Sequence, residues 1–153
     1  MKAFLNCIPC FLRQALDAVR LVTDDEGVCE RLLLEQMSVG KVTVAVRGLP
    51  VITDMTIADT RAAGIPGRVE VIDNGSDAPG TTLEDCSEEF RRRFDQADLV
   101  VAKGQGDYEA LNEVERNIVF LLKANCPVIA RDLACQVGSL ILRRSRRALA
   151  TAF

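Results

Sequence analysis

The 153-residue chain contains no histidine. This absence excludes nucleophilic triads that depend on histidine, as well as zinc sites with histidine ligands. Carboxylates, amide oxygens and thiolates remain as metal ligands, and oxygen ligands favour hard cations such as magnesium or manganese. The acidic and amide side chains are therefore the first candidates for a site.

Long apolar runs and an excess of positive charge are also missing. No stretch is long enough to span a membrane, and the start "MKAFLNCIPC" lacks the features of a signal peptide, so we expect a cytoplasmic protein with no membrane partner. A net charge of −3 gives no electrostatic footprint for nucleic acid. The locally basic "RRSRR" at 143–147 is interpreted as a solvated final helical turn.

Six cysteines are many for this length, but most of them are scattered singly. Those at positions 29, 86, 126 and 135 are expected to be small buried hydrophobes, not a disulfide framework. Cys7 and Cys10 form a CxxC motif that fits a redox pair or half a zinc site, yet few residues precede it and no second pair exists. Two unbridged thiols at a helix start are an equally good interpretation.

The length fits one domain, for which we expect the boundaries 1–153. Apolar residues at helical spacing over Leu12–Val22 and "CERLLLEQM" at 29–37 predict an N-terminal helical segment over 1–39. A short acidic break, "TDDEG", separates these two predicted helices. The remaining residues, 40–153, are expected to form the core of the domain.

Strand and helix patterns alternate through this core. Helices are predicted over 53–64, capped by Thr53 or Asp54, and over 81–97 and 112–124; valine- and isoleucine-rich strands are predicted over 41–48, 69–75, 98–104 and 126–132. Such alternation predicts a parallel sheet of about four strands covered on both faces. The expected fold class is three-layer α/β.

Ligands of open parallel sheets bind outside the carboxyl ends of the strands, where the loops converge. The loops to inspect are 47–56, 73–82, 103–109 and 131–139. Glycines at 75, 80, 104 and 106 let the backbone approach a ligand closely. The same loops contain the polar residues Asp54, Asp73, Asn74, Ser76, Asp77, Lys103, Gln105, Asp107 and Glu109.

A hard cation, a lysine and a glycine-rich backbone together can hold a phosphate and stabilise its charge. In "KGQG", Lys103 would meet an anion, while Gly104 and Gly106 would allow the turn. Each motif by itself fits an ordinary solvated turn equally well. Their shared position at one sheet edge favours a phosphate and metal site.

Four segments, "VRGLPVITDMT", "VIDNGSDAPGT", "DLVVAKGQGDYEALN" and "CPVIARDL…VGS", resemble the DUF89 family of damage-control phosphatases, related to the ARMT1-like proteins. "CIPCFLRQALDAVR" is similar to the start of its cysteine-containing prokaryotic branch. The resemblance implies a Rossmann-like α/β/α core and a phosphatase of sugar phosphates or damaged phosphometabolites. It also implies a divalent metal, Mg, Mn, Co or Ni, as cofactor and a small phosphorylated metabolite as partner.

The resemblance also suggests roles for individual residues. Asp54 resembles the acid that binds the metal, and Lys103 resembles the lysine that contacts phosphate; both are therefore assigned as catalytic. Asp107 stands where the family more often has asparagine. The residues assigned to substrate binding are Asp73, Asn74, Ser76, Gly104 and Asp107.

The chain departs from the family by its shortness. It lacks a "DNxGE" motif, which supplies further metal ligands, and we expect it to lack the first core strand as well. Three alternatives remain open. The chain is a minimal phosphatase whose metal is held by Asp54 with help from Asp73, Asn74 or the acidic break 24–26; an inactive relative that binds a phosphorylated ligand or self-associates; or a shortened product that dimerises through an exposed sheet edge.

Overall fold

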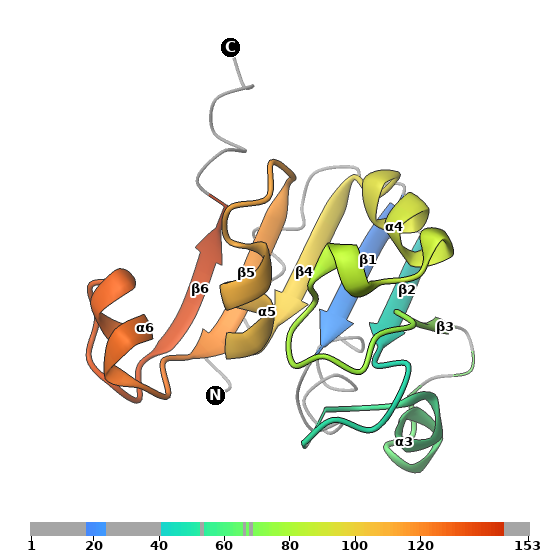
Figure 1. Ribbon diagram of the computed structural model, residues 1–153, viewed down its shortest axis with the longest axis horizontal. Helices are drawn as coiled ribbons and strands as arrows, with labels where there is room; N and C mark the ends of the chain where they lie inside the picture. The colour runs from blue at the N-terminus through green and yellow to red at the C-terminus, as the bar shows by residue number, and fades with distance from the viewer. Residues whose placement is uncertain (1–17, 24–40, 53, 66, 68, 146–153) are drawn as a thin grey trace.

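The computed structural model describes residues 18–23, 41–52, 54–65, 67 and 69–145 (Figure 1). These residues form a mixed α/β fold around one six-stranded sheet, with the strand order β3-β2-β1-β4-β5-β6. The strands are β1 (Ala18–Thr23), β2 (Lys41–Val46), β3 (Glu70–Asp73), β4 (Leu99–Lys103), β5 (Ile118–Lys123) and β6 (Leu140–Arg144). The helices are α3 (Ile57–Ala62), α4 (Glu88–Asp95), α5 (Gln105–Leu111) and α6 (Pro127–Asp132), with a 3₁₀ turn at Leu83–Asp85.

Strands β1 to β5 are parallel, and β6 is antiparallel to β5 at the edge of the sheet. Strands β4 and β5 bury side chains on both faces of the sheet, because successive side chains point to opposite sides. In β4, Val100 belongs to the apolar cluster on one face and Val101 to the cluster on the other. This double burial explains why β4 and β5 are almost continuous apolar runs in the sequence.

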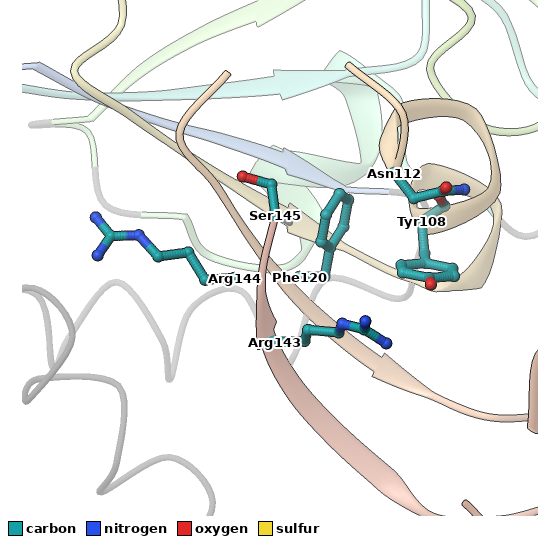
Figure 2. Close-up of a pocket in the computed structure, with 6 residues that line it drawn as sticks. All are labelled: Tyr108, Asn112, Phe120, Arg143, Arg144 and Ser145. Atoms are coloured by element: carbon teal, nitrogen blue, oxygen red, sulfur yellow. The ribbon is translucent and has the colours of Figure 1, made fainter. Parts of the chain in front are cut away.

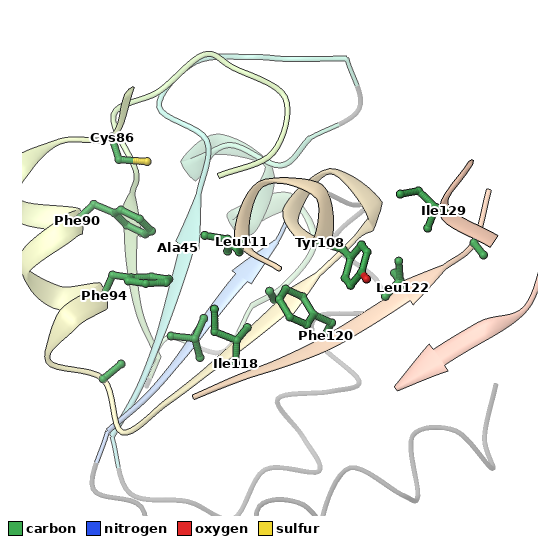
Figure 3. Close-up of a cluster of buried hydrophobic side chains, with 14 of the residues drawn as sticks. Ala45, Cys86, Phe90, Phe94, Tyr108, Leu111, Ile118, Phe120, Leu122 and Ile129 are labelled. Atoms are coloured by element: carbon green, nitrogen blue, oxygen red, sulfur yellow. The ribbon is translucent and has the colours of Figure 1, made fainter. Parts of the chain in front are cut away.

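Helices α4 and α5 cover one face of the sheet (Figures 1 and 3). Phe90 and Phe94 lie four residues apart on α4, so both point into the core, where the transfer of each ring from water contributes about 1.5–3 kcal/mol. Tyr108 of α5 packs edge-on against Phe120 of β5, with ring centroids 5.2 Å apart. The apolar face predicted for 81–97 is thus confirmed, although the α-helix begins only at Glu88.

The other face of the sheet has a separate apolar cluster, in which Met55 packs against Val44, Val46, Leu99 and Val101. The expected three-layer arrangement stays a prediction, since it depends also on what lies over this face outside the described residues. No helix in the described ranges is long and apolar enough to cross a membrane.

The N-terminal prediction needs correction. Residues 18–22, expected in a helix over Leu12–Val22, belong instead to β1, which pairs with β2 on one side and β4 on the other. The chain therefore has a central core strand, and our expectation that the first core strand is missing is wrong. The rest of the predicted N-terminal helices, the acidic break 24–26 and Cys7, Cys10 and Cys29 lie outside the described residues.

Three further predictions near the C-terminus are wrong. Residues 118–123 form β5, not the end of a helix over 112–124, because this segment pairs with β4 and β6 and buries Ile118–Leu122 in the sheet. Residues 127–132 form α6, not a strand, and Pro127 occupies its first turn, where proline is favoured. Arg143 and Arg144 end the edge strand β6 and so do not form a helical turn.

Candidate functional site

The carboxyl ends of the parallel strands bring several predicted residues to one edge of the sheet. Asp73 ends β3 and Lys103 ends β4, as expected. Lys103 pairs in register with Thr23 of β1, and Asp73 pairs with Val46 of β2. The fourth predicted loop, 131–139, instead connects α6 to β6, because the segment before it is a helix.

Arg47, the first residue after β2, connects the loops at this edge. Its guanidinium is 1% exposed and donates from Nε to Asp54 Oδ2 (2.8 Å), from Nη1 to Thr81 Oγ1 (2.9 Å) and from Nη2 to Asp107 Oδ1 (3.1 Å). Thr81 in turn donates to Asp107 Oδ1 (2.7 Å). Asp54, Thr81 and Asp107 come from the segments after β2, β3 and β4, so one side chain joins all three.

Glycines allow the same segments to approach backbone to backbone. A Cβ atom on Gly48 would lie 2.8 Å from the backbone of Gly75, and one on Gly80 would lie 2.5 Å from the carbonyl oxygen of Gly106. Both distances are shorter than side chains tolerate, so the packing of these loops requires glycine at positions 48 and 80.

Asn74 is held rigidly inside this arrangement. Its side chain is 1% exposed, and Oδ1 accepts hydrogen bonds from the backbone N–H groups of Gly48 (3.1 Å) and Ser76 (3.0 Å). Its Nδ2 is buried and has no hydrogen-bond acceptor within the described part of the chain. An unsatisfied buried donor costs about 1–3 kcal/mol, so this amide is the most notable polar group of the loop after β3.

Neighbouring candidates in that loop differ in exposure. Ser76 is buried, and its Oγ accepts from the N–H of Ala78 (3.0 Å), whereas Asp73 and Asp77 are exposed. The loop therefore presents its carboxylates outward and keeps its amide and hydroxyl groups inward.

The turn from β4 into α5 depends on Gly104. Its φ of 118° lies in the region that favours glycine, and its carbonyl accepts the N–H of Tyr108 (3.3 Å) at the start of the helix. Lys103, just before this turn, is half-buried. The predicted lysine and the predicted turn therefore occur together.

Asp107 follows in the first turn of α5 and is fully buried. Burial raises the pKa of its carboxyl group, while Arg47 and the Thr81 hydroxyl oppose this shift by stabilising the anion. Burial also acts to lower the pKa of Arg47, but the carboxylates of Asp107 and Asp54 outweigh it, so the net shift is upward and the guanidinium stays charged. Arg47 thus remains a cation between two acidic side chains.

The fit of a metal ion to this edge is partial. Within the described ranges, no three acidic or cysteine side chains are grouped to hold a metal. Asp54 is a suitable single ligand, because Mg²⁺ is usually bound by one or two carboxylates together with water and substrate phosphate. The nearby Asp59 has another function: its carboxylate accepts hydrogen bonds from the N–H (2.8 Å) and the hydroxyl (2.6 Å) of Thr56 and so caps the start of α3. Thr56, and not Asp54, occupies the cap position.

A small cavity lies elsewhere, between α5, β5 and the end of β6 (Figure 2). Its volume of about 10 Å³ leaves room for about one water molecule. It lies near Ile118, where β5 begins, and thus away from the carboxyl edge. The residues around it are Tyr108, Asn112, Phe120, Arg143, Arg144 and Ser145.

Arg47 and Thr81 were not among the residues selected from the sequence. Arg47 stands near the end of a predicted strand, which is a weak signal, and Thr81 carries no signal of its own. Arg47 lies 34 residues before Thr81 and 60 residues before Asp107 along the chain. Only the folded sheet edge brings them together.

Comparison with known proteins identifies the family. A sequence model of the damage-control phosphatase ARMT1-like domain matches residues 26–141, and the chain belongs to this family. The resemblance inferred from the motifs is thereby confirmed.

Several archaeal proteins are similar to the chain. A damage-control phosphatase of Pyrococcus horikoshii is 37% identical over 82% of this chain, and another of Archaeoglobus fulgidus is 36% identical over 80%. An uncharacterised protein of Methanocaldococcus jannaschii is 36% identical over 79%. The matches cover 46%, 44% and 42% of these relatives, so the chain spans less than half of their length.

A solved structure supports the same relationship. The crystal structure of a DUF89 family protein from Pyrococcus horikoshii superposes with a TM-score of 0.78 and is 32% identical. The match covers 95% of this chain but 51% of that protein. The sheet described above is therefore part of a fold that is larger in the relative.

Proposed function

We propose that the chain is a metal-dependent phosphatase that hydrolyses small phosphorylated metabolites, either sugar phosphates or damaged phosphometabolites, on a Rossmann-like core. The observation that carries this proposal is the connection of Asp54 with the "KGQG" turn. Arg47 contacts Asp54 and also Asp107, which lies in the helix that starts directly after Lys103 and Gly104. A carboxylate suited to a cation and a lysine suited to phosphate are thus joined at one sheet edge.

In this proposal Lys103 binds the phosphate through its charge, and Gly104 gives the backbone its sharp turn. Asn74 binds the substrate through Nδ2, which has no acceptor among the residues that the structure describes. Ser76 and Asp73 flank Asn74 and also contact the substrate in this proposal, Ser76 from the buried side of the loop and Asp73 from its exposed side. The buried Asp107 takes part through Arg47 and Thr81, with which it is hydrogen-bonded.

The proposed cofactor is a divalent cation, Mg, Mn, Co or Ni, with Asp54 among its ligands. Such a cation would polarise a phosphoryl oxygen and neutralise developing charge. The printed names of the Pyrococcus and Archaeoglobus relatives support the phosphatase activity. The proposed location is the cytoplasm, where small phosphorylated metabolites are available as substrates.

The alternative is an inactive shortened relative that binds a phosphorylated ligand or self-associates as a homo-oligomer. One observation favours it: the described residues contribute Asp54 but no group of three ligands. The chain also matches less than half of the length of each relative, so the activity of the longer relatives has to be tested separately for this chain.

An assay with p-nitrophenyl phosphate separates these functions. The purified chain is incubated with Mg²⁺, Mn²⁺, Co²⁺ or Ni²⁺ in turn, and with EDTA as the metal-free control. We expect phosphate release that requires one of these ions and disappears with EDTA. Absence of turnover with every ion would reject the phosphatase proposal and favour the inactive alternative.

A further inference from the structure

We propose that Arg47 is a positioning residue: it fixes Asp54 and the start of α5 relative to each other without touching the substrate. Because Asp54 and the start of α5 belong to the proposed phosphatase site, this inference rests in part on the proposed function. Its structural part, the locking of three loops by one side chain, can be tested independently.

The contacts of the guanidinium are distributed over three segments. Nε donates to Asp54, Nη1 to Thr81 and Nη2 to Asp107, at 2.8, 2.9 and 3.1 Å. Each nitrogen thus contacts a segment that follows a different strand. The backbone contributes too, since the N–H of Arg47 donates to the carbonyl of Met55 (2.9 Å) and closes the loop that contains Asp54.

Burial separates a positioning role from direct binding. With 1% of Arg47 exposed and its three nitrogens directed at protein partners, little of the side chain is available to a phosphate. Lys103 is half-buried at the end of β4 and is the better cation for that contact. Arg47 therefore acts on the reaction through Asp54 and α5.

The choice of arginine follows from geometry. Its planar fork presents donors in several fixed directions, whereas a lysine offers one compact ammonium group. Lysine at position 47 would keep the charge but could not reach Asp54, Thr81 and Asp107 together. Arg47→Lys is therefore a variant that removes positioning while preserving the charge balance.

Asp107 has a specific part in this arrangement. Its Oδ1 accepts from both Arg47 and Thr81, and an asparagine oxygen could accept the same two bonds. Asp107→Asn would therefore keep the contacts but leave the buried arginine with Asp54 as its single described carboxylate partner. The variant isolates the contribution of charge from that of hydrogen bonding.

Hydrogen exchange followed by mass spectrometry tests the structural part. In Arg47→Lys we expect faster exchange in the peptides of all three segments, 47–56, 74–82 and 104–111, and unchanged exchange in α4 and β5. The matched control is Arg93→Lys: Arg93 also contacts two carboxylates, Glu70 (2.6 Å) and Glu89 (2.9 Å), but on α4 and at the start of β3. This control should leave the three segments protected.

Kinetics with p-nitrophenyl phosphate and Mn²⁺ test the functional part. We expect Arg47→Lys to lower kcat about 10- to 100-fold, the loss usual for groups that orient a ligand, with KM nearly unchanged. The Mn²⁺ concentration for half-maximal activity should rise. Asp107→Asn should show a smaller change in the same direction.

Two results would overturn the proposal. One is a folded Arg47→Lys protein whose three segments exchange as slowly as in the wild type; the other is a variant that raises KM alone, which would mean direct substrate contact. If Arg47→Lys does not fold, Thr81→Val replaces it: unchanged exchange in 74–82 and 104–111 would then count against the role. If the wild type has no turnover, the proposed function fails, while the exchange result still decides the positioning role.

Discussion

Gly80 and Gly106 lie in direct backbone contact: a Cβ atom at position 80 would be 2.5 Å from the carbonyl oxygen of Gly106. The contact joins the loop after β3 to the first turn of α5, and Gly80 has a φ of 75°, in the region that favours glycine. Two independent constraints, backbone conformation and space, therefore act on the same residue.

Gly80→Ala is accordingly expected to destabilise the protein. The left-handed backbone by itself costs about 1–2 kcal/mol for a residue with a Cβ, and the contact with Gly106 adds to this. For a chain of this size, Tm should fall by about 2–4 °C per kcal/mol in a thermal unfolding experiment. Gly67→Ala is the control, since no atom of the described residues lies within 4 Å of its Cβ position; a similar loss of Tm there would contradict the explanation.

Asp54→Asn should abolish most of the proposed phosphatase activity. Asparagine can still accept the hydrogen bond from Arg47, so the fold is retained, but the negative charge for a cation is lost. We expect kcat/KM with Mn²⁺ to fall by about 100-fold or more, the order seen when one electrostatic group of an active site is removed.

Asp59→Asn is the control for the Asp54 variant. Asp59 is exposed and accepts hydrogen bonds from Thr56 at the start of α3; these bonds hold the pKa of its carboxyl group below the ordinary value. Its replacement should lower Tm slightly and leave turnover intact. Equal activity of the two variants would remove the special role of Asp54.

Lys103→Met should lower kcat/KM less than Asp54→Asn does, and it should act mainly on substrate binding. A hydrogen bond to a charged group contributes about 1.5–3 kcal/mol, so kcat/KM should fall by about 10- to 100-fold, chiefly through KM. Lys123→Met is the matched control, because Lys123 also ends a parallel strand but is exposed. Steady-state kinetics in which both lysine variants behave alike would argue against a phosphate contact by Lys103.

Cys86 should resist alkylation in the native protein. Burial raises the pKa of its thiol to about 11, and a raised pKa favours the protonated, unreactive form, so only about one thiol in a thousand is ionised at pH 8. Mass spectrometry after iodoacetamide treatment should find Cys86 unmodified under native conditions and modified in urea. Rapid native labelling at pH 8 would show that the helix α4 region opens readily.

The sequence alone determined much of the sheet edge. Runs rich in valine and isoleucine located β2, β3 and β4, because β-branched residues favour strands and because the interior strands β2 and β4 bury apolar side chains on both faces. The glycines after these strands marked turns, and Asp73 and Lys103 at strand ends followed directly. The motifs in these loops also carried the family resemblance, which the family match over 26–141 bears out.

Periodicity could not settle the short apolar segments. "AVRLV" at 18–22 and "IVFLLK" at 118–123 fit a helix and a strand almost equally well, and both are predicted as helical from the sequence. "PVIARD" at 127–132 contains residues favoured in strands, yet it forms α6. Hydrogen bonds with neighbouring strands decided the first two cases, since a segment that lies between two strands of the sheet satisfies its backbone on both sides.

Tertiary structure alone decided the role of Arg47. Its partners Asp54, Thr81 and Asp107 lie 7, 34 and 60 residues away along the chain, and no local pattern relates them. They meet because parallel strands bring all their carboxyl ends to one edge, and because a buried guanidinium must find partners to offset the loss of water. The sequence could therefore nominate a carboxylate and a lysine, whereas the buried arginine that connects their loops emerged only from the fold.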